Sequence, residues 1–198
     1  MNNIAEMTLS ARFKSILFRG NDVEVSAFGF ECLDGWEGLL SGALHLAQTY
    51  AIDKRLDLQI TSIKEKFGAL RICHHGGDEA IDLVFDITEL VSSCTCEICG
   101  RQGTLIDLSG WLQTRCTEHA VPNPSTQNIK KHSLPNYSIN YARTLGTVVW
   151  FFKKDSLRWA SEKNIGLGGI YPYEALASLE GCEEVYLLIQ RLSYGVEI

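Results

Sequence analysis

Four of the seven cysteines lie within the stretch CTCEICGRQGTLIDLSGWLQTRCTEH, residues 94–119. Two residues separate Cys96 from Cys99, and two residues separate Cys116 from His119. Such a spacing lets a tight turn direct both side chains at one ion, and two pairs of this kind are typical of tetrahedral zinc sites. The spacing predicts one structural Zn²⁺ per chain, with Cys96, Cys99, Cys116 and His119 as its ligands.

A hairpin is expected between the two ligand pairs. Gly100 follows the first pair and allows the chain to turn back without a Cβ clash. The segment TLIDLSGWLQTR, residues 104–115, is expected to form two short strands that turn at Ser109-Gly110. A knuckle, a hairpin and a second ligand pair make up the plan of zinc ribbons and treble clefs. Cys94 is then a spare thiol or a substitute ligand.

The predicted zinc site favours a structural role over a catalytic one. Four protein ligands close the coordination sphere, whereas a catalytic zinc binds three and keeps a position for water. Glu97 and Glu118 lie within the two pairs, but a residue between knuckle ligands is expected to point outward. Nothing else in the chain assembles a nucleophile, a base and an oxyanion donor. The protein is therefore predicted not to be an enzyme.

A second group of metal-binding residue types is Cys73-His74-His75. It could bind another metal or hold a catalytic thiol, which would make the protein a metal-dependent hydrolase. No acid or base at ligand spacing accompanies it. We favour the alternative in which these residues end a strand that enters the Gly76-Gly77 turn.

Charge and hydropathy disfavour several classes of partner. The net charge is −6, and no segment concentrates positive charge as non-specific phosphate binding requires. Nucleic acid is therefore disfavoured as a partner, while remaining an alternative. No apolar run approaches the roughly 18–20 residues of a membrane span. The odd number of cysteines and the lack of a signal peptide predict a reducing, cytoplasmic location.

Hydrophobic periodicity predicts an α+β fold. Residues 36–52 are expected to form an amphipathic helix, and residues 56–75 two strands joined around Lys64–Gly68. A second helix is expected to begin at Asp78. The helix–hairpin–helix module and the zinc site together occupy residues 1–120.

The rest of the chain is predicted to be a linker and a small all-helical domain. Residues 121–138 contain three of the four prolines and little apolar periodicity, which predicts the linker. Residues 139–198 are expected to form short helices, of which one ends at Gly181 and the last begins at Glu183. The tryptophans are all expected in the core: Trp36, Trp111, Trp150 and Trp159.

The N-terminal part resembles small uncharacterised bacterial and phage-borne proteins. The segments that carry the likeness are IKEKFGALRI, GGDEAI and CEICGRQGTLIDLSGWLQTRCTEH. Those proteins have a KEKFG-type hairpin followed by a zinc knuckle and a GWL-x-T-x-C stretch. The resemblance spans about residues 34–120, brings no known activity, and implies a bacterial or phage-infected host.

The C-terminal part resembles the toxin-binding domain of MbcA/ParS/Xre-type antitoxins. In that family a helix ending in Trp-Leu precedes a Leu-Gly-Gly turn, a Pro, a Leu-rich turn, a Gly and a final helix. The matching residues are Trp159, Leu167, Gly168, Gly169, Pro172, Leu176, Gly181, Val185, Leu188, Leu192 and Gly195. The resemblance covers about residues 139–198.

This second resemblance implies binding to a RES-domain toxin, an NAD-consuming enzyme, whose active-site cleft the antitoxin's C-terminal end covers. The predicted function is therefore neutralisation of a cognate toxin by occlusion. Because the inner face of the last helix is expected in the core, the predicted partner-binding residues are the outer ones: Tyr186, Arg191, Tyr194, Val196, Glu197 and Ile198.

Two features depart from the family pattern. Ile170 and Tyr171 stand where the family often has a basic and a small polar residue. The zinc module replaces the usual helix-turn-helix, which leaves open whether the chain binds operator DNA.

The alternative function is a zinc-dependent nucleic-acid-binding or adaptor module, such as a phage counter-defence factor. A second copy of the chain is a further candidate partner.

Overall fold

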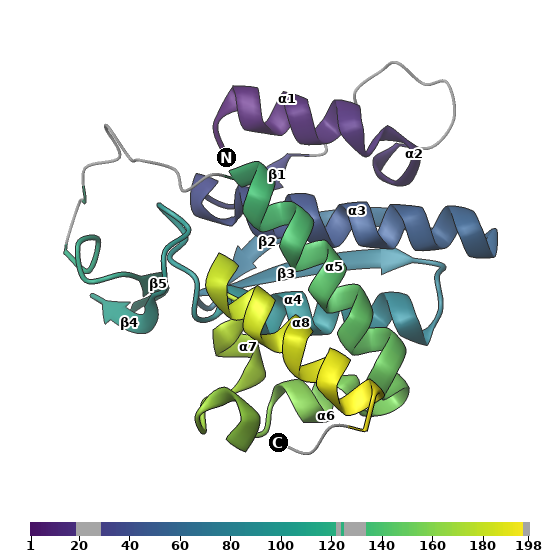
Figure 1. The fold of residues 1–198 in the computed structure, drawn as a ribbon. Helices are drawn as coiled ribbons and strands as arrows, with labels where there is room; N and C mark the ends of the chain where they lie inside the picture. Colours follow the sequence, from purple (N-terminus) through teal and green to yellow (C-terminus); the bar gives the residue numbers. More distant parts are fainter. Residues whose placement is uncertain (19–28, 122–123, 125–133, 196–198) are drawn as a thin grey trace.

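The computed structural model describes residues 1–18, 29–121, 124 and 134–195. The fold is α+β, as predicted, and its strands form one three-stranded sheet and one two-stranded sheet. The first elements are α1 (Asn3–Arg12), α2 (Lys14–Leu17), β1 (Phe30–Glu31), the 3₁₀ helix η1 (Asp34–Trp36), α3 (Glu37–Lys54), β2 (Gln59–Lys66), β3 (Ala69–His75) and α4 (Glu79–Ser92). They are followed by β4 (Thr104–Leu108), β5 (Trp111–Arg115), α5 (Leu134–Phe152), η2 (Lys153–Asp155), α6 (Ser156–Ala160), η3 (Ile165–Leu167), α7 (Pro172–Ala175) and α8 (Leu179–Ser193). Figure 1 shows the β4–β5 hairpin at one side of the molecule.

The helices and strands with the clearest periodicity occur where they were predicted. β2 and β3 form an antiparallel pair whose turn holds Phe67 and Gly68, both at positive φ. A Cβ on Gly68 would lie 2.2 Å from Leu105 Cδ1 on β4, so this glycine serves both the turn and a close contact. Asp78 accepts the N–H groups of Ala80 and Ile81 and thereby caps α4.

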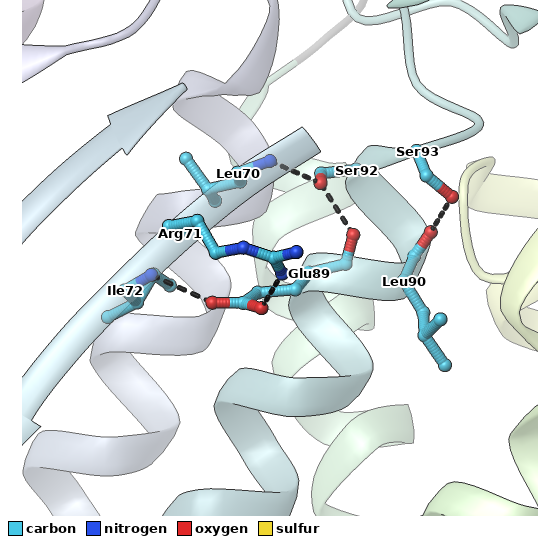
Figure 2. Close-up of polar contacts among 7 residues, drawn as sticks. All are labelled: Leu70, Arg71, Ile72, Glu89, Leu90, Ser92 and Ser93. Carbon is cyan, nitrogen blue, oxygen red and sulfur yellow. Dashed lines mark hydrogen bonds and ion pairs between the residues drawn. The ribbon is translucent and has the colours of Figure 1, made fainter. Parts of the chain in front are cut away.

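The side chains of α4 satisfy the free edge of the three-stranded sheet (Figure 2). β3 is an edge strand, so alternate N–H groups have no strand partner. The N–H of Leu70 donates to Ser92 Oγ at 2.8 Å, and the N–H of Ile72 donates to Glu89 Oε1 at 3.0 Å. Glu89 also pairs with Arg71. These contacts bind the sheet to α4 and leave the edge closed to another chain.

The two predicted parts share one hydrophobic core. α3 packs against α5, and α5 packs against α8. At the first contact a Cβ on Gly42 would lie 2.8 Å from Ser138 O, so the two backbones approach closely there. The hydroxyls of Thr88 and Tyr141 form a buried hydrogen bond of 3.0 Å between α4 and α5. One cluster of buried apolar residues contains members from both parts, from Leu9 to Ile189.

The segment before α5 differs in part from the predicted linker. α5 begins at Leu134, so residues 134–138 belong to a helix. Residues 122–123 and 125–133 lie outside the described residues. No helix in the described ranges combines the length and hydropathy needed to cross a bilayer.

The last helix begins earlier than the sequence indicated. α8 starts at Leu179 and is capped by Ser178, whose Oγ accepts the N–H of Gly181 at 3.0 Å. Gly181 was predicted to end the preceding helix, but it lies in the first turn of α8. A Cβ there would meet Ala175 O at 2.0 Å. The glycine is therefore required by the close approach of α7 and α8, and the prediction of a start at Glu183 was wrong.

Two of the four tryptophans are not in the core. Trp36 is fully buried and donates its Nε1–H to Thr95 O at 2.8 Å, while Trp159 stacks on Phe152. Trp111 is 64% exposed and Trp150 is 76% exposed. Trp111 lies on the two-stranded hairpin, whose strands pair only with each other, and Trp150 lies on the outer face of α5.

Candidate functional site

The first ligand pair lies in a knuckle that follows α4. The N–H of Cys96 donates to Arg101 O at 2.7 Å, and the N–H of Gly100 donates to Cys96 O at 2.9 Å. Gly100 has φ of +75°, which permits the chain to reverse directly after Cys99. The predicted role of this glycine is confirmed, and both thiols are directed to the same side of the turn.

The second ligand pair follows the hairpin. β4 and β5 pair from Thr104↔Arg115 to Leu108↔Trp111, with the turn at Ser109 and Gly110 as predicted. Cys116 comes directly after β5, and the N–H of His119 donates to Cys116 O at 3.0 Å. The hairpin therefore returns the second pair to the first.

The four predicted ligands form one compact buried group. The ligand atoms of Cys96, Cys99, Cys116 and His119 all lie within 4.8 Å of one another. His119 Nδ1 is 3.5 Å from Cys96 Sγ and 3.2 Å from Cys116 Sγ, and the sulfurs of Cys99 and Cys116 are 3.7 Å apart. The hydrogen bond between Cys96 and Cys99 lowers the pKa of Cys99 and raises the pKa of Cys96.

These separations fit a tetrahedral metal site. In a zinc site the ion lies about 2.3 Å from each sulfur and about 2.0–2.1 Å from the nitrogen. At tetrahedral angles, two such ligand atoms are then roughly 3.5–3.8 Å apart. Three thiolates and one imidazole are a soft donor set that suits zinc better than magnesium or calcium. The geometry is therefore compatible with one structural metal ion.

The fourth cysteine of the stretch does not join this group. Cys94 is buried, and its Sγ contacts Val91 O at 3.2 Å and Tyr173 O at 3.7 Å. Tyr173 belongs to α7, so Cys94 lies where the end of α4 meets the C-terminal helices. Burial raises the pKa of Cys94 to about 12, which keeps it a neutral thiol.

Glu97 does not point outward as predicted. It is 2% exposed, and its Oε1 lies 3.0 Å from Nη2 of Arg115, which is 5% exposed. Burial raises the pKa of Glu97 to about 7 against the opposing effect of the guanidinium. Glu118, by contrast, is on the surface with Arg101. The prediction was therefore right for Glu118 and wrong for Glu97, which forms a buried ion pair beneath the knuckle.

The group Cys73-His74-His75 is not assembled into a site. His74 Nε2 lies 3.3 Å from Asp82 and its Nδ1 lies 3.0 Å from Gly76 O, whereas Cys73 and His75 are exposed. Because successive side chains alternate across a strand, His74 lies on the opposite face from its two neighbours. Among the described residues, no second group has metal-ligand geometry.

The predicted partner-binding residues lie on the last helix and beyond it. Val185 and Leu188 are buried, as expected for the inner face of α8. Tyr186 is half-buried, and the guanidinium of Arg143 stacks 4.2 Å above its ring. Arg191 is exposed and Tyr194 is 80% exposed. The other predicted residues, Val196, Glu197 and Ile198, lie outside the described residues.

Comparison with known proteins gives no relative: no protein-family model, no curated protein and no solved structure matches this chain.

Proposed function

We propose that this protein is an antitoxin-type inhibitor that binds and occludes a RES-type, NAD-consuming toxin in the bacterial cytoplasm. The observation that carries the proposal is the exposure of Arg191, in the last turn of α8, and of Tyr194, which follows that helix, whereas Val185 and Leu188 of the same helix are buried. Tyr and Arg are enriched among residues that dominate binding energy at interfaces. The backbone at Arg191 is already ordered in α8, so only side-chain entropy is lost when this residue binds.

Several residues that carry the resemblance to antitoxins have a clear structural role in the C-terminal helices. Gly168 and Gly169 have φ of +72° and +80°, a conformation that glycine adopts most easily. Pro172 is the first residue of α7, where its fixed φ suits a helix start. Gly181 admits the backbone of Ala175. These roles in the fold support the proposal.

The N-terminal part contributes a metal-stabilised module in this proposal. We assign Zn²⁺ to the group of three cysteines and one histidine, in a zinc ribbon or treble-clef-like arrangement. When bound, the ion neutralises the thiolates and joins the two ligand pairs. Because all four positions are filled by protein ligands, the residues of this site hold the fold and do no chemistry on a substrate.

The proposal is tested by co-expression with the RES-type reading frame nearest to the gene of this chain. The full chain should co-purify with the toxin and preserve cellular NAD, whereas a variant lacking residues 194–198 should lose that protection at an unchanged melting temperature. Full protection by the shortened variant would rule out occlusion through the end of α8.

A second candidate function, an adaptor that binds through the zinc module, is favoured by the β4–β5 hairpin. Three large apolar side chains are exposed there: Leu105, Trp111 and Leu112. In this case Trp111→Ala would weaken co-purification of the partner, and Tyr194→Ala would leave it unchanged. Nucleic acid is a weaker choice for the same surface, because the chain carries a net charge of −6.

A further inference from the structure

A pocket of about 350 Å³ lies among α3, α4 and α5, on elements that neither the metal group nor the exposed end of α8 uses. Its volume falls within the range of about 300–1,000 Å³ that is common for small-molecule sites. The lining residues come from the second half of α3, the start of α4, the end of α5 and η2.

The packing of α3 and α5 explains why a pocket forms here. Gly42 lies against Ala142, and Leu46 faces Gly146 four residues further along both helices, so the two helices run in the same direction. Figure 1 shows them crossing and separating toward their C-terminal ends, where α4 begins. A Cβ on Gly146 would lie 3.2 Å from Leu46 Cδ1, so Leu46 packs closely on the backbone of α5 at the narrow end.

The walls of the pocket are mainly apolar and its rim is aromatic. Leu83, Val84 and Val149 are buried and form apolar walls. Trp150 is 76% exposed at the rim, although the indole is a side chain that proteins usually cover. The Tyr50 hydroxyl donates to Asp78 Oδ2 at 3.0 Å, which fixes the second aromatic ring. Two aromatic rings therefore line the pocket beside its apolar walls.

Two adjacent lysines supply the charge at this rim. Within the described part of the chain, no acidic side chain forms an ion pair with Lys153 or Lys154. Lys153 has φ of +51°, an unfavourable conformation for a residue with a side chain. The carboxylate of Asp78 is engaged by Tyr50 and by the first N–H groups of α4. Glu79 also lines the pocket, and it would repel an anion.

We propose that this pocket is a binding site for an aromatic organic anion, whose rings lie against Trp150 over the apolar walls and whose anionic group is bound by Lys153 and Lys154. This proposal does not depend on the proposed inhibition of a toxin, since Arg191 and Tyr194 do not line the pocket.

The test uses two fluorescent probes that differ in charge. 8-Anilinonaphthalene-1-sulfonate is an aromatic anion, and N-phenyl-1-naphthylamine is its neutral counterpart. The folded chain should bind one molecule of either probe, and Trp150→Ala should weaken both by about tenfold, because the aromatic contact with the indole is lost. The variant Lys153→Gln/Lys154→Gln should weaken only the anion, by about fivefold, whereas Glu79→Gln should strengthen only the anion.

Trp111→Ala is the matched control, because Trp111 is a second exposed indole far from the pocket residues in the chain. It should bind both probes as the unaltered protein does, and all variants should keep the same melting temperature. The proposal is overturned if neither probe binds, if Trp150→Ala binds both normally, or if the lysine variant weakens both probes equally. It is also overturned if Trp150→Ala instead weakens only the complex with the toxin, since the rim would then be a protein contact.

Discussion

The cysteine knuckle and the helical half of the chain (α5 to α8) both contain buried residues. Those of the knuckle are mostly cysteines, whereas those of the helical half are mostly large apolar side chains. The separate buried cluster of the knuckle consists of Ile98 and three cysteines: Cys96, Cys99 and Cys116. The helical half buries a wide apolar surface that includes Tyr141, Leu145 and Val185. The helices are therefore stabilised mainly by the hydrophobic effect, whereas the knuckle buries little apolar surface of its own, and we expect a metal ion between its ligand pairs to supply its stability.

The contact between the two regions shows how far a change in one would reach the other. The N–H of Gly35 donates to Glu97 O at 2.9 Å, and the indole of Trp36 donates to Thr95 O. A Cβ on Gly35 would lie 2.1 Å from Cys96 O, so the backbones are in direct contact. Trp36 itself belongs to the main apolar cluster. The knuckle is therefore joined to the main core by hydrogen bonds and by direct backbone contact.

The largest effect is expected from Cys99→Ser. Structural Zn²⁺ contributes about 10–16 kcal/mol of binding free energy in small zinc-finger peptides, so loss of one thiolate should release the ion and unfold the knuckle. We expect one zinc per chain by elemental analysis and none in the variant. Hydrogen exchange should then accelerate over residues 94–121 and remain slow in α3, α4 and α5.

Cys73→Ser is the control for this change, because Cys73 is exposed and outside the ligand group. It should keep the zinc and the exchange pattern of the unaltered protein. Global unfolding of Cys99→Ser would contradict the separation of the two sources of stability, and a zinc-free native protein would contradict the metal site itself.

A smaller effect is expected from Arg115→Leu, which removes one partner of the buried pair. The carboxylate of Glu97 would then be left without its counter-charge at 2% exposure, which should cost about 3–5 kcal/mol in urea unfolding. The double variant Glu97→Leu/Arg115→Leu should recover most of that loss.

Arg101→Ala is the control, because it breaks the exposed ion pair with Glu118 and should change the free energy of unfolding little. An equal loss in the single and double Arg115 variants would show that packing, not charge, is responsible.

The sequence was sufficient to predict those features that depend on residues within one turn or one short motif. The two ligand pairs were assigned from spacing alone, and Asp78 and Pro172 were placed correctly at helix starts because capping and a fixed φ act within one turn. The antiparallel hairpin of β2 and β3 follows from alternation and a turn glycine.

Features that depend on contacts between distant segments could not be predicted in this way. Glu97 turns inward because the hairpin brings Arg115 beside it, and no local pattern marks that pairing. The shared core depends on the contact of Gly42 with Ser138, which are 96 positions apart in the printed sequence. Trp150 is exposed because nothing in the described structure packs over that face of α5, although a tryptophan at that place favours burial.

Gly181→Ala tests the helical half by a change in one contact. An alanine normally favours a helix over glycine, but here its Cβ would meet Ala175 O at 2.0 Å. We expect a loss of about 1–3 kcal/mol in unfolding free energy, typical of overpacking, with the zinc content unchanged. Gly146→Ala is the matched control, since its Cβ would meet only the flexible end of Leu46. A variant as stable as the control would show that α7 and α8 can separate freely.

The smallest effect on stability, and a clear effect on binding, is expected from Arg191→Ala. Arg191 is exposed in the last turn of α8, where its positive charge favours the helix C-terminus by only a few tenths of a kcal/mol to about 1 kcal/mol. If it also contacts the toxin, truncation should weaken the complex by about 1–2 kcal/mol, or roughly five- to thirtyfold in Kd by calorimetry. Arg158→Ala removes another exposed arginine, one that pairs with Asp155, and should leave Kd unchanged. Were the two variants to bind equally well, Arg191 would serve only the helix end, and occlusion would have to rest on other residues.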